Sequence, residues 1–235
     1  LAHRLQPFSH ESNKAIFAAT TMLYMGWLAK QMKPYAAKAD CKSKCSYCCY
    51  QMVQISPLEA FRIATVLKDE AIPRVQEAAE RLAPYNTHER MEQRFRDGIP
   101  CVFLRNQQCS IYAVRPTTCA TFLSLDVRGC RAGWEGRFLP EIPTANYIKN
   151  AQNIGISGQM ALDFSFWKVG LQTDHFELSY AVAKATEPGA LNAWLSGIHV
   201  FDSRRAYVYK QDGRQGHYTK LMELMDRNIL LKERE

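Results

Sequence analysis

Cysteine is the residue type whose number and spacing in this sequence indicate chemistry. All eight cysteines of the 235-residue chain lie between Cys41 and Cys130, and four of them fall within nine residues. A thiolate is a soft anionic ligand for zinc, copper(I) or iron, and neighbouring thiolates repel one another unless a cation lies between them. Buried free thiols and incidental disulfides explain such clustering less well than metal binding does. The eight candidate metal ligands are Cys41, Cys45, Cys48, Cys49, Cys101, Cys109, Cys119 and Cys130.

The first four cysteines form a compact group. Cys45 and Cys48 have the two-residue separation of a metal-binding knuckle, in which a tight turn aims two sulfurs at one centre. Cys48 and Cys49 are neighbours, and neighbouring side chains usually point apart. One of the two is therefore expected to serve a second metal, a bridging position or a disulfide. Two four-sulfur sites and one cluster with spare thiols both remain open.

The second group of cysteines lies in a segment whose residues predict a β-hairpin followed by a helix. Residues 100–104 and 109–112 read as two short strands joined by a polar turn, with a cysteine on each strand. Pro116 is well placed at the first position of a helix. That helix would carry Cys119 in its first turn, where backbone amides and the helix dipole favour a thiolate.

These linked motifs resemble the YkgJ-type cysteine-cluster family, which is described as a group of zinc- or iron-chelating domains. The residues that carry the resemblance are the Cys41-x3-Cys45-x2-Cys48-Cys49 group, Pro-Cys-x-Phe-Leu at 100–104 and Cys-x-Ile-Tyr-x2-Arg-Pro-x2-Cys-x2-Phe at 109–122. The flagellin lysine methylases carry a similar cluster that is associated with iron and sulfur. The resemblance implies that seven of the cysteines are the family's own, whereas Cys130 lies outside the motif. Ala120 stands where many relatives have arginine.

The identity of the metal is argued from spacing. Structural zinc sites made only of cysteines commonly use two knuckles, and here one pair has that spacing. Irregularly spaced cysteines can hold a cubane cluster, so an iron–sulfur cluster of the [4Fe–4S] type is favoured, with zinc as the alternative. The six histidines are scattered, none lies within either cysteine group, and all are expected on the surface or in the core.

Tyr112 and Arg115 lie within the second cysteine group. One interpretation is that Tyr112 packs and Arg115 pairs with a carboxylate. The other is that both residues surround the bound cofactor, and that the charge of Arg115 offsets thiolate charge and steers the chemistry of the centre.

Composition limits the class of protein. A hydrophobic content of 47% fits a folded chain, and the net charge of +7 arises from interspersed charges without a long basic run. Nucleic-acid binding is therefore not expected. The uncharged segment 15–29 is shorter than the roughly 20 residues that span a bilayer, so no membrane span is expected. Cysteines confined to a minority of the chain favour metal-bound thiolates in a reducing cytoplasm over a secreted disulfide scaffold.

We expect a mainly α-helical domain with an irregular cysteine-rich core that contains a short β-hairpin. The expected helices cover residues 11–33, 56–70, 73–82, 87–96, 144–168, 174–185, 188–195 and 218–231, with a loop at 123–140 and an extended excursion at 207–213. Residues 1–235 are expected to form a single domain with the cysteine core at 41–130. A separate helical lobe of residues 141–235 is the alternative.

The function expected from the sequence is that of a metal-binding protein with a redox or metal-handling role. The alternative is a metal-dependent enzyme that modifies a small molecule or a protein side chain. No separate catalytic motif, such as a glycine-rich phosphate loop or an HExxH sequence, is present. The sequence identifies no substrate and no protein partner.

Overall fold

The computed structural model describes residues 10–217 apart from residues 43, 86–87, 207 and 212–213. The α-helices are α1 (His10–Ala36), α2 (Pro57–Ala64), α3 (Ile72–Leu82), α4 (His88–Arg96), α5 (Thr117–Thr121), α6 (Val127–Glu135), α7 (Lys149–Lys168), α8 (Leu178–Ala185) and α9 (Ala190–Leu195). The strands are β1 (Gln54–Ile55), β2 (Leu104–Arg105), β3 (Gln108–Cys109), β4 (Phe176–Glu177), β5 (Val208–Gln211) and β6 (Arg214–His217). Short 3-10 helices include η1 (Tyr47–Tyr50).

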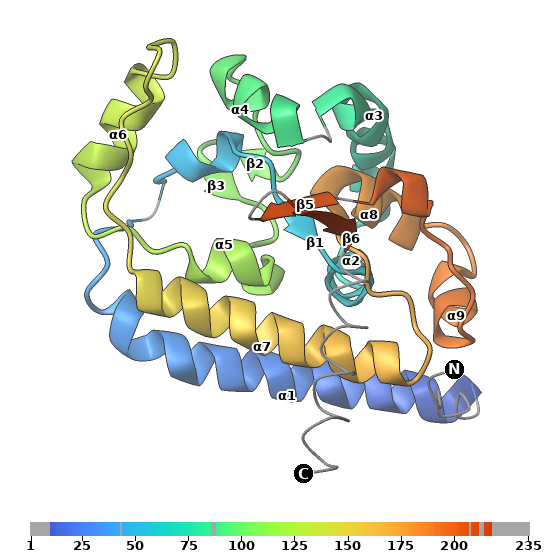
Figure 1. Ribbon diagram of the computed structural model, residues 1–235. Coiled ribbons are helices and arrows are strands. Elements are labelled where there is room, and N and C mark those ends of the chain that lie inside the picture. The colour runs from blue at the N-terminus through green and yellow to red at the C-terminus, as the bar shows by residue number, and fades with distance from the viewer. Residues whose placement is uncertain (1–9, 43, 86–87, 207, 212–213, 218–235) are drawn as a thin grey trace.

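The two longest helices form the base of the molecule. Helices α1 and α7 lie side by side and run in opposite directions, and the other elements lie above them (Figure 1). One side of α1 packs inward through Phe17, Leu28 and Met32. No helix in the described ranges is long and apolar enough to cross a membrane.

The central core lies between α2, α3, α8 and the base. Helix α8 packs against both α2 and α3, and β1 pairs antiparallel with β4 so that Ile55 faces Phe176. The side chain of Trp194 on α9 is fully buried and contacts the rings of Phe17, Phe61 and Phe166. Burial of each such aromatic side chain contributes on the order of 2–3 kcal/mol to the hydrophobic free energy of folding.

Several sequence predictions are confirmed. The fold is mainly helical, with an irregular cysteine region that contains the hairpin β2–β3. Ser56 caps α2 in a capping box with Glu59, and Pro57 occupies the first helical turn. Within the extended excursion expected at 207–213, the described residues 208–211 form β5, which pairs with β6. The expected final helix at 218–231 lies outside the described residues.

Other expected boundaries are wrong. Helix α1 continues through Pro34 to Ala36, so the one backbone hydrogen bond that this proline removes does not end the helix. Helix α2 ends at Ala64 rather than at residue 70. The residues before α7 and α8 are extended, since Ile148 donates to Leu123 and residues 176–177 form β4. Cys101 precedes β2, so only Cys109 lies on a strand of the hairpin.

The expected loop at 123–140 is also wrong, because residues 127–135 form α6, which carries Cys130. Asp126 caps this helix by accepting a hydrogen bond from the backbone of Arg128. The glycines that suggested a loop serve packing instead. A Cβ atom at Gly133 would lie 2.6 Å from the carbonyl oxygen of Pro143. The absence of a side chain therefore lets the segment before α7 pass close to α6.

Segments from both sides of residue 141 contact one another. Helix α7 packs on α1 and α5, α8 packs on α2 and α3, and β4 pairs with β1. The buried guanidinium of Arg94 on α4 donates to the buried carboxylate of Glu177 at 2.9 Å. The expectation of one domain over residues 1–235, with 141–235 as a possible separate lobe, stays a prediction.

Gly155 and Gly158 mark close helix contacts. A Cβ atom at Gly155 would lie 2.6 Å from Cγ2 of Thr121 on α5. At Gly158 it would lie 2.5 Å from the ring of Trp27 on α1. Helix α7 therefore uses two glycines one turn apart to approach a neighbour on each side.

Gly155→Ala should lower the free energy of unfolding by about 1–3 kcal/mol, because the added methyl group overpacks the contact with buried Thr121. Gly26→Ala is the matched control, since a Cβ atom there meets nothing within 4 Å. In that helical position alanine should be neutral or stabilising by up to about 1 kcal/mol. Urea denaturation of both variants measures the difference, and equal effects would contradict the close packing of α5 on α7.

Candidate metal centre

The cysteine region is built from several short segments that the fold brings together. Cys41 follows α1, Cys48 and Cys49 lie on η1, Cys119 lies on α5 and Cys130 on α6. Figure 1 shows η1, the hairpin β2–β3, α5 and α6 on the same side of the molecule, above one end of the base helices. Residues up to 89 positions apart in the sequence therefore share one region.

Backbone hydrogen bonds connect the two cysteine groups. The amide of Cys101 donates to the carbonyl of Cys49 at 2.7 Å, and the amide of Ser124 donates to the sulfur of Cys41 at 3.3 Å. In the hairpin turn, Asn106 and Gln107 have φ values of 48° and 63°. Two successive residues in the left-handed region make a tight turn whose twist suits a two-residue hairpin. This turn brings Cys109 back opposite Leu104.

The eight sulfurs divide into two neighbourhoods according to which thiols repel one another electrostatically. The outer group is Cys41, Cys45 and Cys130, and the inner group is Cys49, Cys101, Cys109 and Cys119. Cys48 interacts with members of both groups. Its side chain is exposed, as is that of Cys41, whereas the other six are half-buried. All eight are free thiols.

Burial is the main reason why most of these thiols resist ionisation. It raises the pKa of Cys45, Cys109 and Cys130, and it raises the pKa of Cys101 to about 11. Repulsion by neighbouring sulfurs adds to this effect. Bringing several thiolates together here is therefore costly without a cation, and a bound metal ion would supply one.

Cys119 differs from the sequence expectation. Its pKa is raised well above the usual value, first by burial and then by the neighbouring cysteines and Glu59. The helix N-terminus does not offset this, because the amide of Thr117 already donates to the carboxylate of Glu59 at 2.7 Å. The carboxylate of Glu59 therefore occupies the helix N-terminus that was expected to stabilise the thiolate of Cys119.

The adjacent cysteines also differ from expectation. Their side chains share a hydrogen bond instead of pointing apart. This bond lowers the pKa of Cys48 and raises that of Cys49. The positive charge of Arg115 further lowers the pKa of Cys48.

The donor set fits a soft metal, although the sulfurs are not at coordination distance. Among the described residues, no three cysteine, histidine, aspartate or glutamate side chains are placed to hold one ion. Metal binding would have to draw the thiols closer together. Free thiols gathered in one neighbourhood supply the soft sulfur donors that a zinc or iron–sulfur site uses, and a bound cation would offset the cost of ionising them. The eight ligand assignments stay predictions.

Arg115 and Tyr112 lie beside this region. The guanidinium carbon of Arg115 lies 4.3 Å from the ring centroid of Tyr112, whose side chain is largely exposed. The charge of Arg115 also lowers the pKa of Cys109, although burial outweighs it there. These contacts favour the interpretation in which Arg115 offsets thiolate charge, and the role of both residues stays a prediction.

A clamp from α2 holds the corner that precedes α5. Arg62 donates to the carbonyls of Val114 and Arg115 at 3.1 and 2.9 Å, and Glu59 accepts from Thr117 on the other side of Pro116. Glu59 and Arg62 are almost fully buried. Sequence reasoning assigned Glu59 only to the capping box and missed Arg62. The available signal was a glutamate and an arginine three positions apart in an otherwise apolar helix.

A buried polar chain extends the clamp to α7. The hydroxyl of Thr117 lies 3.1 Å from Oε1 of Gln159, whose amide nitrogen donates to Asp163 at 2.9 Å. The other carboxylate oxygen of Asp163 lies 2.9 Å from Nε2 of His175. The Asp163 contact raises the pKa of His175 although burial opposes this shift. His175 is therefore a core residue, as expected for the histidines.

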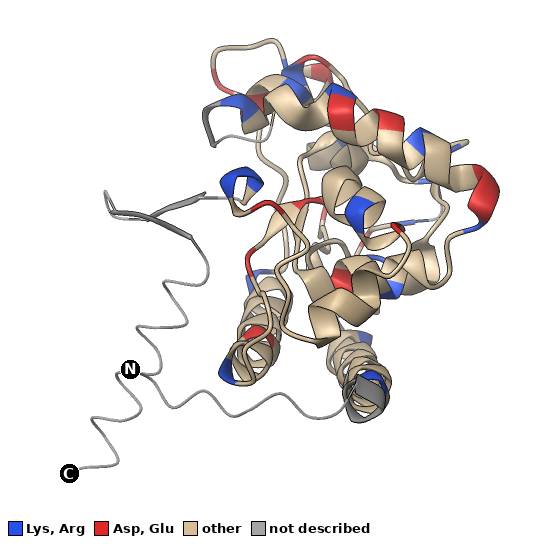
Figure 2. Cartoon of the chain, turned by 90° about the vertical axis from the view of Figure 1, so that its right-hand side faces the viewer, with Lys and Arg blue, Asp and Glu red and all other residues tan. Residues whose placement is uncertain are grey.

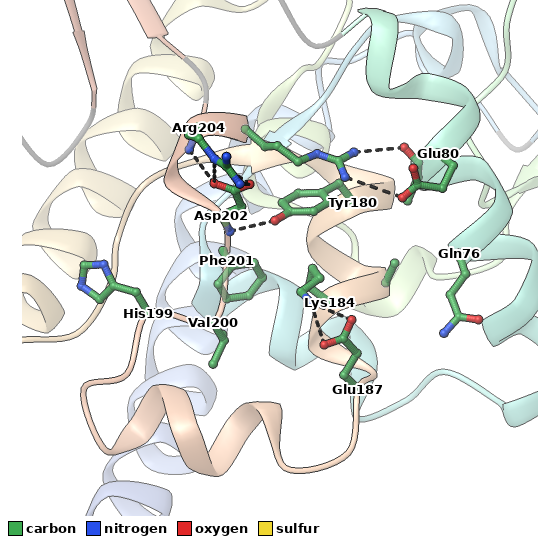
Figure 3. Close-up of a pocket in the computed structure, with 13 residues that line it drawn as sticks. Gln76, Glu80, Tyr180, Lys184, Glu187, His199, Val200, Phe201, Asp202 and Arg204 are labelled. Carbon is green, nitrogen blue, oxygen red and sulfur yellow. Dashed lines mark hydrogen bonds and ion pairs between the residues drawn. The ribbon is translucent and has the colours of Figure 1, made fainter.

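A pocket of about 650 Å³ lies away from the cysteines, between α3, α8 and residues 199–205 (Figure 3). Its charged side chains pair with one another: Lys184 with Glu187 at 2.7 Å, Arg204 with Asp202 at 2.8 Å, and Arg205 with Glu80 at 3.6 Å. No cysteine lines it, so it is separate from the candidate metal centre.

Comparison with protein families gives one match. Residues 40–138 match the CxxCxxCC family, described as a "Putative zinc- or iron-chelating domain". This confirms the resemblance to a cysteine-cluster family, and the matched segment includes Cys130. Comparison with curated proteins and with solved structures gives no match.

Glu59→Ala should lower the free energy of unfolding by about 2–4 kcal/mol, because it leaves the buried amide of Thr117 and the capping box without their acceptor. Glu59→Gln keeps one acceptor oxygen and should cost less. Glu80→Ala is the control, since Glu80 is an exposed glutamate that forms a surface ion pair, and its effect should be within about 0.5 kcal/mol. Thermal and urea unfolding measure these changes. An alanine effect as small as that of the control would show that the clamp does not stabilise the fold.

Proposed function

We propose that this chain, whose residues 40–138 match a zinc- or iron-chelating family, binds metal through all eight cysteines in two centres. The outer centre would use Cys41, Cys45 and Cys130 together with Cys48 as its fourth ligand. The inner centre would use Cys49, Cys101, Cys109 and Cys119. The gathering of all eight cysteines into one region, with Cys41, Cys45 and Cys130 as neighbours and the inner four as another set of neighbours, is the observation that supports this proposal. Cys48 interacts with both sets, and we assign it to the outer centre to complete four ligands there.

The two centres would differ in accessibility. Two of the four outer ligands are exposed, whereas the inner cysteines are half-buried between η1, the hairpin and α5. An exposed four-thiolate site suits an exchangeable metal ion, and a covered site with irregular ligand spacing suits an iron–sulfur cluster of the [4Fe–4S] type or a structural zinc ion. We therefore assign metal handling to the outer centre and a structural or redox role to the inner one. A reducing compartment such as the cytoplasm would keep the thiols available.

A metal-dependent enzyme is the second candidate, and one observation favours it. Cys48 is exposed, its pKa is lowered by its bond with Cys49, and Arg115 lies near it. An accessible thiolate next to a guanidinium could react with a small molecule or a protein side chain. Alkylation of metal-loaded protein separates the two roles. Rapid labelling of Cys48 would favour the enzyme, and protection would favour ligation.

The experiment that tests the proposal is metal analysis of protein purified without oxygen, combined with an absorption spectrum. Brown protein with iron and acid-labile sulfide would identify a cluster, and colourless protein with two zinc ions would identify two thiolate sites. Protein that binds neither metal when all thiols are reduced would overturn the proposal.

Substitutions should separate the two centres. Cys45→Ser should remove the outer metal and leave the inner one, whereas Cys101→Ser should remove the inner metal and lower the melting temperature more strongly, because the inner ligands lie closer to the core. Ser46→Ala is the control in the same loop and should retain both metals. Metal-to-protein ratios from elemental analysis give the result. Loss of all metal from both cysteine variants would contradict two separate centres.

Metal affinity should rise with pH. The raised pKa of Cys101, Cys109 and Cys119 keeps these thiols protonated at neutral pH, so a metal ion must displace their protons. Because fewer protons compete as pH increases, the association constant for zinc should increase by at least about tenfold per pH unit near neutrality. Competition with a chromophoric chelator, together with proton release into a weak buffer, measures this. An affinity independent of pH would contradict thiol ligation.

A further inference from the structure

The face of the base that points away from the core is uncharged along its middle and carries large apolar side chains on α1. Residues 15–29 of α1 contain no charged side chain, and the one charged residue of α7 between positions 150 and 167, Asp163, is buried. The lysines of the two helices, Lys14, Lys30, Lys33, Lys149 and Lys168, lie toward the helix ends, and Figure 2 shows the charged residues of the whole chain. Large apolar side chains remain exposed on α1, including Ile16 at 41%, Leu23 at 70% and Trp27 at 40%.

The α1 half and the α7 half of this face differ in shape. Ile16, Leu23 and Trp27 are spaced by seven and four residues, so they form one stripe of large side chains along α1. A groove of about 430 Å³ runs between the helices, lined on α7 by the small residues Ser157, Gly158 and Ala161 with Asn153 and Ile154, and on α1 by Trp27 and Gln31. The face therefore has a ridge at Ile16 and Leu23 on α1 and a recess between the helices, which Trp27 borders.

We propose that a second copy of this chain packs against this face. A two-fold axis along the groove would place α1 of each copy over α7 of the other, so that each ridge meets the recess of its partner. The same arrangement brings no like charges together, since neither half of the face is charged. The dimer would then contain two stacked layers, and each layer would be the antiparallel pair of α1 and α7 from one copy.

The size of the face fits a reversible dimer. The uncharged part of α7 is about 27 Å long, and two helices packed side by side are about 20 Å wide. Each copy would bury about 500 Å², or about 1,000 Å² in total, which lies at the lower limit for specific protein interfaces. We therefore expect a dissociation constant on the order of micromolar.

Sedimentation velocity of the full chain, metal-loaded and reduced, tests the proposal at concentrations up to about 100 µM, well above this dissociation constant. The wild-type chain should form a dimer. Leu23→Glu should shift it to monomer, because it places a charge in the interface. Ile198→Glu is the matched control, since Ile198 is 58% exposed and lies outside the face. It should leave the dimer intact.

A mixing experiment tests the pairing of the helices. Ala161→Lys should also weaken self-association, and an equal mixture of this variant with Leu23→Glu should restore a dimer, because the new charges then face each other across the interface. A monomeric wild type would overturn the proposal, including the case in which another segment of the chain covers the face. A dimer that survives Leu23→Glu, or a mixture that stays monomeric, would overturn the assigned face.

Discussion

The carboxylate of Glu59 connects three parts of the structure within the core. It completes the cap of α2, it accepts a hydrogen bond from the first amide of α5, and it raises the pKa of Cys119 through its charge. Burial of a carboxylate costs free energy unless it accepts hydrogen bonds. The groups that donate to Glu59 are therefore held close to it. Arg62 holds the preceding carbonyls from the same helix. The corner that presents Arg115 and Cys119 is therefore fixed by α2, which contains no cysteine itself.

This arrangement gives the thiols a fixed support and an unfavourable charge environment. Most of the half-buried sulfurs favour the protonated form, and the charge of Glu59 adds to this effect at Cys119. The inner thiols therefore have little tendency to ionise on their own. A metal cation would provide the missing compensation, which is why we regard chelation as the function that this architecture supports best.

The sequence predicted the ligand types, the family resemblance and the helical class, because cysteine spacing and capping signals are local. It could not predict which sulfurs are neighbours. The proximity of Cys130 to Cys41 depends on α6, and α6 was hidden by Gly129 and Gly133, whose role is close packing against residues 143–145. The clamp was missed for a similar reason. The partners of Arg62 are backbone carbonyl groups more than 50 residues away, and because every residue has such a group, the sequence does not indicate which ones Arg62 contacts.

The hydrogen bond between Ser124 and Cys41 joins positions 83 residues apart, and so the cysteine region closes a very long loop of chain. Closure of a loop of this length removes conformational entropy from the unfolded chain that is worth about 4–5 kcal/mol when the link is permanent. A metal ion bound by the outer cysteines would form such a link. Its effect on stability would then come as much from restricting the unfolded ensemble as from the bonds in the folded state. Contacts of such high sequence separation also form slowly, which places completion of this region late in folding.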